Sequence, residues 1–294
     1  MLKFLTKAII FLGVVVGAIT FVYLYDLYQE IKDDIDSVVN YNPKQSTQFF
    51  DKNGKLLANT FKDENREYVN YDDIPARVIE GLVAIEDTQF FEHFGVNPDA
   101  ISRAVIKNIQ SGGYSEGAST LTQQLIKVLL LSREKKIIRK VKEALLAIRL
   151  ETVLTKEEIL ERYLNHVYFG HGYYGVKTAA KGYFKKNLYE LTLKEIAILV
   201  GLPRAPSFYD PTKNLQVSLA RANQVITRMH TLGWINNEQF EESINETPTI
   251  YNQTLTQNIA PYAIDYAVSE LVNDIPDILY GGYKVYLTID LDAQ

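Results

Sequence analysis

One stretch decides how the rest of the chain is interpreted, and it reads Glu86-Asp87-Thr88-Gln89-Phe90-Phe91-Glu92-His93-Phe94-Gly95. It follows an apolar segment with helical spacing that begins at Pro75. A carboxylate at the end of a buried helix, beside aromatic rings, is partly removed from water, which suits it to proton abstraction. Glu86 is therefore a candidate general base. The alternative is a solvated helix end above an aromatic core.

A second polar run lies downstream, from Gly117 to Lys127. The glycines before it predict a loop, and Ser119 is the predicted N-cap of the helix that follows. Hydroxyl and amide groups gather at this helix start, and such groups bind sugar hydroxyls or phosphate oxygens. Capping explains Ser119 or Thr120 alone, but it does not explain the whole run.

The third block is Arg139-Lys140-Val141-Lys142-Glu143. In a helix, Arg139, Lys140 and Glu143 share an arc of roughly 100° that lies off the apolar stripe. Two cations and a carboxylate are thus presented together. The alternative is an ordinary solvated face, with Arg139 and Glu143 as an i,i+4 pair that contributes a few tenths of a kcal/mol.

A fourth block, Lys156-x-x-Ile159-x-Glu161-x-Tyr163-Leu164-Asn165, predicts a capped helix that runs into a glycine-bearing turn and serves mainly as scaffold. Taken in order, the four blocks resemble the signatures of the bacterial peptidoglycan glycosyltransferase domain. They read Glu-Asp-x-x-Phe-x-x-His-x-Gly, Gly-x-Ser-Thr-x-Thr-Gln-Gln, Arg-Lys-x-x-Glu and Tyr-Leu-Asn. Each is weak alone, but the combination is specific. The resemblance covers about Pro75 to Pro211.

The resemblance implies a mainly α, lysozyme-like domain that polymerises lipid II into glycan strands. The anomeric centre inverts and undecaprenyl diphosphate is released. By the same resemblance, Glu86 is the general base on the acceptor sugar hydroxyl, and Glu143 is the second important glutamate. Asp87, Phe90 and His93 would shape the site around the base.

The remaining site residues are also implied by the resemblance. The predicted diphosphate-binding residues are Lys127, Arg139 and Lys140. The residues predicted to line or adjoin the donor cleft are Arg103, Asn108, Ser119, Thr120, Gln123 and Gln124. Val128 stands where the family usually has asparagine. Mg²⁺ or Mn²⁺ is compatible with this chemistry, with Glu143 as the candidate ligand, although the sequence holds no evident carboxylate cage.

An uncharged apolar run, Ala8–Tyr25, follows Lys3 and Lys7 and precedes several acidic residues. It is long enough to span a bilayer, and the basic flank predicts that the short tail stays inside the cytoplasmic membrane. A cleaved signal peptide is the alternative, but no convincing small-x-small cleavage site follows the run. The prediction is a single-pass anchor with the catalytic domain on the outer, periplasmic side.

Composition narrows the chemistry further. The net charge is −5, so there is no global basic field of the kind that nucleic-acid binding usually shows. The chain has no cysteine, which excludes thiolate nucleophiles and cysteine-bound metals. The expected partners are lipid II, the growing glycan strand, the cytoplasmic membrane and proteins of a cell-wall synthesis complex.

The predicted organisation is a tail at 1–7, an anchor at 8–25, a stalk with a β-hairpin at 26–74 and the glycosyltransferase domain at 75–250. Residues 251–294 are predicted as a helix and strand at the start of a linker. The hairpin turns at Asn53-Gly54, and the strand Tyr283–Asp290 has no visible partner. The end of the chain resembles the junction into a penicillin-binding transpeptidase domain, so we expect a bifunctional protein truncated before it.

Two other functions fit some of these features. A lysozyme-like hydrolase or lytic transglycosylase also uses a glutamate in a helical cleft, but it has no diphosphate to hold. A non-catalytic cell-wall scaffold would not need Glu86 and Glu143. The cationic residues on the predicted helix around Arg139 therefore favour the glycosyltransferase.

Overall fold

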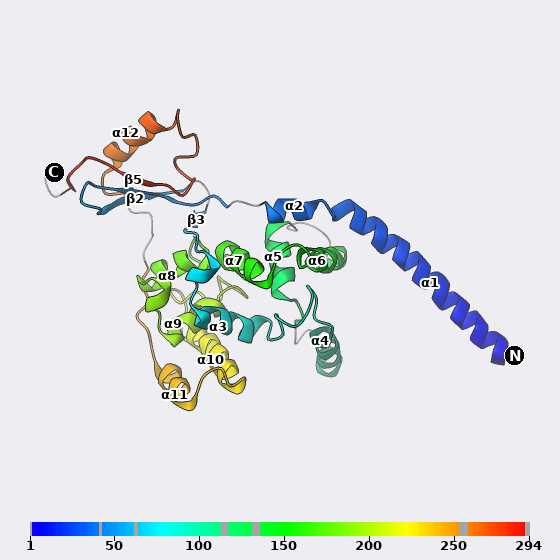
Figure 1. Cartoon of the computed structure of the whole chain (residues 1–294). Coiled ribbons are helices and arrows are strands. Elements are labelled where there is room, and N and C mark those ends of the chain that lie inside the picture. Colours follow the sequence, from blue (N-terminus) through cyan, green and yellow to red (C-terminus); the bar gives the residue numbers. More distant parts are fainter. Residues whose placement is uncertain are drawn as a thin grey trace. The chain divides into compact units, whose positions relative to one another are not determined.

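The computed structural model of the chain is mainly helical, as the sequence predicted, and it describes residues 2–40, 43–61, 64–112, 117–130, 136–252 and 258–291 (Figure 1). The chain forms two compact units. Unit 1 comprises Met1–Tyr41 and Glu92–Thr155, and unit 2 comprises Asn42–Phe91 and Lys156–Gln294. The stretch that opens the sequence argument is therefore divided, with Glu86 in unit 2 and His93 in unit 1.

Unit 1 consists of helices. In chain order they are α1 (Leu2–Ile31), α2 (Asp34–Val39), α4 (Pro98–Ser111), α5 (Leu121–Leu129) and α6 (Lys136–Leu150). Helices α1, α2 and α5 all pack against α6. Within α1, residues Ile9–Ile31 are long and apolar enough to cross a membrane.

Helix α4 begins and ends where the sequence predicted. The Asn97 side chain accepts a hydrogen bond from the Ala100 backbone N–H, and Pro98 occupies the first turn. Gly112 closes the helix with φ of 66°, a conformation that glycine adopts without strain. Gly113, the second glycine of this predicted stop, lies outside the described residues.

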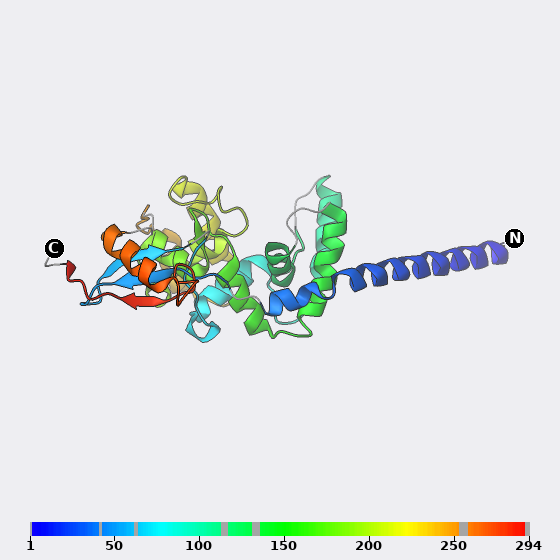
Figure 2. The same ribbon diagram turned by 90° about the horizontal axis from the view of Figure 1, so that it is seen from above.

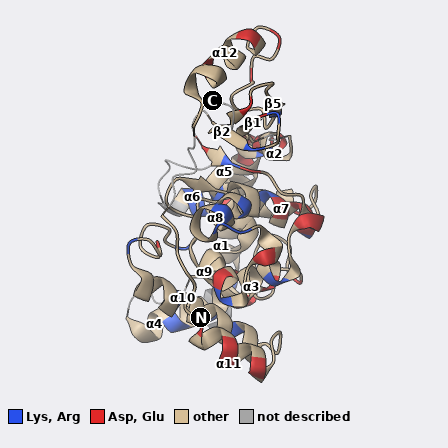
Figure 3. Ribbon diagram, turned by 90° about the vertical axis from the view of Figure 1, so that its left-hand side faces the viewer, with Lys and Arg blue, Asp and Glu red and all other residues tan. Residues whose placement is uncertain are grey.

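The larger helical part of unit 2 is built around α9, which contacts α3, α8, α10 and α11. Its helices are α3 (Ala76–Glu86), α7 (Lys156–His166), α8 (Val176–Phe184), α9 (Leu193–Gly201), α10 (Leu215–Thr231) and α11 (Asn237–Asn245), with 3-10 turns at Tyr71–Asp73 and Leu188–Glu190. Helix α9 is buried along its whole length and packs against α3 and α10. The predicted capping box of Thr192 and Glu195 is confirmed. Acidic residues are prominent on α7 and α11 (Figure 3).

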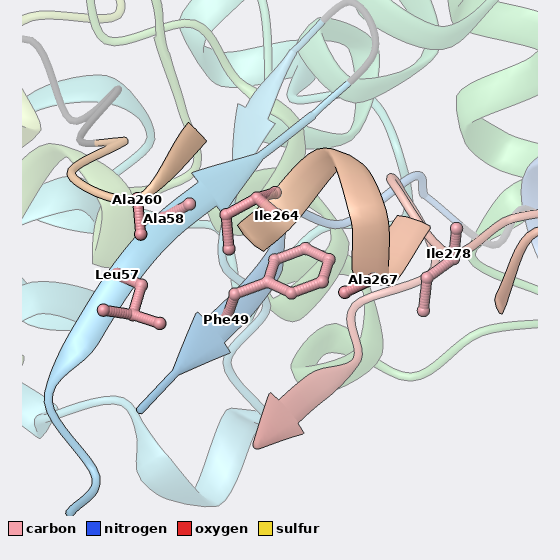
Figure 4. Close-up of a cluster of buried hydrophobic side chains, with 7 residues drawn as sticks. All are labelled: Phe49, Leu57, Ala58, Ala260, Ile264, Ala267 and Ile278. Atoms are coloured by element: carbon pink, nitrogen blue, oxygen red, sulfur yellow. The ribbon is translucent and has the colours of Figure 1, made fainter. Parts of the chain in front are cut away.

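Unit 2 also carries a small β-module. Strands β1 (Thr47–Phe50) and β2 (Leu56–Thr60) form the predicted antiparallel hairpin, with Gly54 at φ of 82° in the turn. Helix α12 (Pro261–Leu271) packs over this hairpin around Phe49 and Leu57 (Figure 4). The hydrophobic cluster comprises Phe49, Leu57, Ala58, Ala260, Ile264, Ala267 and Ile278.

The strand near the end of the sequence does have a partner, contrary to our expectation. Strand β5 (Lys284–Tyr286) pairs in parallel with β1, so the sheet order is β2-β1-β5. The sequence pattern showed a strand but could not show that its partner lies more than two hundred positions earlier. A second, two-stranded parallel sheet joins β3 (Asn65–Arg66) to β4 (Tyr173–Tyr174).

Asn165 of the Tyr-Leu-Asn block has a structural role, as the scaffold interpretation predicted. Its amide nitrogen donates to the Val69 carbonyl at 2.8 Å, and its amide oxygen accepts from the Val69 N–H at 2.9 Å. The same nitrogen donates to the Glu161 carbonyl at 2.8 Å. Asn165 thereby holds the segment before α3 against α7.

Candidate active site

Glu86 is the last residue of α3, and its carboxylate faces α10 in unit 2. Arg221 Nη2 on α10 donates to Glu86 Oε1 at 3.1 Å. The side chains of Glu86 and Arg221 are only 10% and 5% exposed. The solvated helix end that we weighed for Glu86 is therefore wrong, because this carboxylate is held in a buried ion pair.

Arg221 is a site residue that the sequence reasoning missed. It lies on the buried stripe of α10, whose members are Ser218, Arg221, Ala222, Val225, Ile226 and Met229. Burial lowers the pKa of Arg221, and the negative charge of Glu86 opposes that shift. An arginine at a core position needs a buried anion as partner, and that placement was the available signal.

Asp87 and Phe90 lie close to Glu86 in sequence and are both buried. Asp87 caps α3, and its carbonyl accepts from the Phe90 N–H at 2.9 Å, which makes a tight turn. The Phe90 ring lies under the Lys156 ammonium group, 4.4 Å from the ring centroid. These contacts give Phe90 a packing role in unit 2. That Asp87 and Phe90 also shape a substrate site stays a prediction.

The predicted cationic cluster lies in unit 1 on α6. Lys140 Nζ lies 2.5 Å from Glu143 Oε2, and Arg139 Nε lies 3.2 Å from Glu143 Oε1. Glu143 is only 1% exposed, whereas Arg139 is 25% and Lys140 is 49% exposed. The ordinary wet face that we considered is thereby excluded for Glu143. The carboxylate is buried beneath two cations that remain open to solvent.

Ser119 joins this cluster, but it does not cap α5 as predicted. Lys140 Nζ donates to Ser119 Oγ at 2.7 Å. The N-cap is Thr120, whose hydroxyl accepts from the Gln123 N–H, while the Gln123 side chain accepts from the Thr120 N–H. This reciprocal pair outcompetes a cap at Ser119 because it satisfies two backbone donors at once.

Thr120 and Gln123 are buried, and their capping contacts account for their positions. Gln124 is half-buried in the first turn of α5. Packing of α5 on α6 places this polar run beside the cationic cluster within unit 1. That these side chains line the donor cleft stays a prediction.

His93 is buried in unit 1, where its Nδ1 lies 4.0 Å from Glu151 Oε1. Thr122 donates to the same oxygen at 2.5 Å.

Gly95, at the end of the first block, lies close to α6. Thr120 donates to the Gly95 carbonyl at 2.6 Å. A Cβ on Gly95 would lie 2.5 Å from the Ala147 carbonyl carbon, so only glycine fits this approach to α6. The Gly95 end of the first block and the polar start of α5 are therefore held close to α6 within unit 1, and Glu151 is a second residue that the sequence reasoning missed.

Three predicted site residues complete unit 1. Lys127 is exposed in the last turn of α5, while Arg103 is exposed and Asn108 is half-buried on α4. The structure therefore gathers the predicted donor-side residues in one unit and keeps Glu86, Asp87 and Phe90 in the other.

Glu143 does not fit the role of metal ligand in this arrangement, because each of its oxygens faces a cation. Within the described ranges, no group of three or more His, Cys, Asp or Glu residues could hold a metal ion. The compatibility with Mg²⁺ or Mn²⁺ inferred from the resemblance stays untested.

Most of this chain is similar to known proteins. A family model described as Transglycosylase matches residues 53–230. Penicillin-binding protein 1A of Aquifex aeolicus is 41% identical over 96% of this chain, and that of Escherichia coli is 38% identical over 92%. The chain spans only 39% and 32% of those two relatives. A crystal structure of penicillin-binding protein 1A from Haemophilus influenzae gives a TM-score of 0.47 at 26% identity, over 86% of this chain and 28% of that one. By the match over residues 53–230, the chain belongs to the transglycosylase family.

Proposed function

We propose that this chain is a peptidoglycan glycosyltransferase that polymerises lipid II into glycan strands. The observation that carries the proposal is the pairing in unit 1, where a buried Glu143 supports two solvent-facing cations. Such an arrangement suits an anionic leaving group, and a diphosphate is the anion that lipid II would release. A hydrolase acting on glycan alone would have no use for it.

In the proposed reaction, Glu86 removes the proton from the 4-hydroxyl of the acceptor sugar. The hydroxyl oxygen forms a bond to the anomeric carbon of the donor strand, and the bond from that carbon to the diphosphate oxygen breaks. The hydroxyl attacks the anomeric carbon from the face opposite the diphosphate, so the anomeric centre is inverted. Arg221 contributes by fixing the orientation of the Glu86 carboxylate through its hydrogen bond to Oε1.

The departing diphosphate develops negative charge that must be stabilised in the transition state. Arg139 and Lys140 are the proposed binding groups, and the exposed Lys127 is the third. Glu143 would orient the two cations rather than contact the substrate, because it is buried beneath them. Ser119, which accepts from Lys140, would help to set the direction of that ammonium group.

We propose that the cations of α6 stabilise the diphosphate without a divalent ion bound to Glu143. The support is that both oxygens of Glu143 already face a cation. We therefore expect removal of Mg²⁺ and Mn²⁺ by a chelator to slow polymerisation far less than loss of Lys140. A complete loss of activity with chelator, restored by either ion, would show that a metal is essential.

The apolar α1 is the proposed membrane anchor, with the basic tail in the cytoplasm and the residues that follow α1 on the periplasmic side. Lipid II and the growing strand would reach the enzyme from the outer leaflet. Other proteins of cell-wall synthesis are proposed partners. If this orientation is correct, protease added outside sealed vesicles that expose the periplasmic face of the membrane should digest the residues that follow α1.

The direct test supplies the purified chain, in liposomes, with labelled lipid II. Glycan polymer is expected, together with release of undecaprenyl diphosphate. Cleavage of preformed glycan without polymerisation would instead favour the lysozyme-like hydrolase. Binding without turnover of either substrate would favour the non-catalytic scaffold.

A further inference from the structure

Helix α1, the proposed anchor, continues beyond its exposed apolar part into the packing of unit 1. Helix α1 runs without interruption from Leu2 to Ile31, and Figure 2 shows it as one straight rod leading to α2. Its outer part is exposed, whereas Leu27 and Ile31 near its end are buried. A flexible tether would need a break between these two parts, and the helix contains none.

The buried end of α1 contacts the helix that bears the cationic cluster. Both α1 and α2 pack against α6, and the apolar side chains Ile31, Ile35 and Val38 are almost fully buried. Glu30 Oε1 lies 3.3 Å from Lys142 Nζ; the lysine side chain is only 9% exposed, whereas that of Glu30 is 66% exposed. Lys142 directly precedes Glu143, so α1 is joined to α6 at the level of the cluster.

The sequence sets the height of this joint above the membrane. The apolar run ends at Tyr25, and Asp26 is the first charged residue after it. Glu30 lies four positions further, which corresponds to about 6 Å along the helix axis. The Glu30–Lys142 contact therefore lies about one helical turn beyond the uncharged run and near the end of the candidate span Ile9–Ile31, close to the depth of lipid head groups.

We propose that α1 is a rigid strut that holds Arg139, Lys140 and Glu143 at the depth where the diphosphate of a membrane-held lipid lies. The proposal rests on the proposed function and adds a positioning role for Glu30, Leu27 and Ile31. The diphosphate stays at the bilayer surface because its polyprenyl chain stays in the bilayer. When the cluster is held at a fixed height above the membrane, it can bind the diphosphate without first moving along the membrane normal. This reduces the entropic cost of binding.

The test changes the length of α1 in the full chain. A seven-residue helical insertion of alanine, glutamate and lysine after Tyr25 moves the part of unit 1 that follows the insertion about 10 Å away from the membrane. It turns that part by only roughly 20° about the helix axis. A glycine and serine insertion of the same length is the matched control, because it separates the units from the anchor without fixing their height. Each protein is assayed with lipid II in liposomes and with a short-chain lipid II analogue that remains in solution.

If α1 is a rigid strut, the helical insertion should lower the polymerisation rate of membrane-held lipid II about tenfold or more. The rate on the soluble analogue should be unchanged. The flexible insertion should recover part of the loss. Parental activity of the helical insertion on membrane-held lipid II would overturn the strut. So would an equal loss on both substrates, since α1 would then be acting on the folding of unit 1. If the parent itself polymerises neither substrate, the proposed function fails.

A single charge change tests the joint itself. Glu30→Lys places two ammonium groups together, whereas Asp36→Lys makes the same charge change at an exposed position of α2. Glu30→Lys should slow polymerisation of membrane-held lipid II several-fold more than Asp36→Lys, with no difference between them on the soluble analogue. Equal rates for both variants in liposomes would contradict a positioning role for Glu30.

Discussion

The two carboxylates proposed for the site are both held by cations, but they are buried in opposite senses. In unit 2, Arg221 is the more buried partner at 5% exposure, and Glu86 is the more open one at 10%. In unit 1, Glu143 is buried at 1% exposure, and its partners Arg139 and Lys140 are the open ones at 25% and 49%. In unit 2 both partners are thus nearly buried, whereas in unit 1 the carboxylate is buried and its two cations are more open to solvent.

Under the proposed function, this difference in the exposure of the cations gives the two glutamates different roles even though both form ion pairs. Glu86, with a single cationic partner, is the one proposed to accept a proton from a substrate hydroxyl. A carboxylate beneath two cations cannot reach a substrate, but it can orient the groups that bind an anion. The residue types alone would make Glu86 and Glu143 equivalent, and only their burial separates them.

The sharpest way to break this comparison is to neutralise Glu86. Glu86→Gln keeps the size of the side chain but removes the base, so we expect the polymerisation rate to fall by about 10²–10⁴-fold. Glu80→Gln on the same helix is the matched control, since Glu80 is more exposed and pairs with Arg77. Rates with labelled lipid II decide the matter. Parental activity of Glu86→Gln would remove the general base from the proposal.

The buried pair in unit 2 should be the more important one for stability. Arg221→Met leaves the Glu86 carboxylate without this partner, and breaking a buried pair typically costs about 3–5 kcal/mol. The free energy of unfolding, measured by urea titration, should fall accordingly. In the double variant with Glu86→Gln the loss should be smaller, because no buried charge remains. Equal losses in the single and double variants would show that Arg221 acts through packing alone.

The open cations of unit 1 should affect substrate binding more than stability. Lys140→Ala removes a partly exposed charge, and a hydrogen bond to a charged group is worth about 1.5–3 kcal/mol, so kcat/KM should fall roughly 10–100-fold. Arg149→Ala on the same helix is the control, because Arg149 is exposed and binds Thr152. The free energy of unfolding should fall less for Lys140→Ala than for Arg221→Met, because Arg139 still faces the buried Glu143 carboxylate. Equal kcat/KM values for the two variants would argue against the diphosphate site.

The sequence was sufficient for the elements whose signals are local. The hairpin at Gly54, the start of α4 at Asn97 and the capping box at Thr192 each depend on residues within a few positions of one another. The shared face of Arg139, Lys140 and Glu143 followed from helical periodicity in the same way. Local spacing therefore predicted the cluster but not how deeply Glu143 is buried.

The missed features depend on contacts between distant parts of the chain. Arg221 contacts Glu86 across 135 positions of the sequence, and β5 pairs with β1 across more than two hundred. No periodicity within a short window reports such a contact. The N-cap of α5 was missed for a different reason, since Ser119 and Thr120 are both good capping residues and only the partner Gln123 selects between them.

The smallest expected effects come from the two helix caps, which offer a matched pair, one in each unit. Thr120 and Thr192 both form capping boxes, so replacing either with alanine should lower the free energy of unfolding by about 1 kcal/mol. Their other contacts differ. Thr120 also donates to the Gly95 carbonyl and lies next to Ser119, which accepts from Lys140, whereas Thr192 donates to Glu246. Thr120→Ala should therefore lower polymerisation several-fold more than Thr192→Ala at equal loss of stability. If rate tracks stability identically in both variants, the polar start of α5 supports the fold of unit 1 and has no separate part in the reaction.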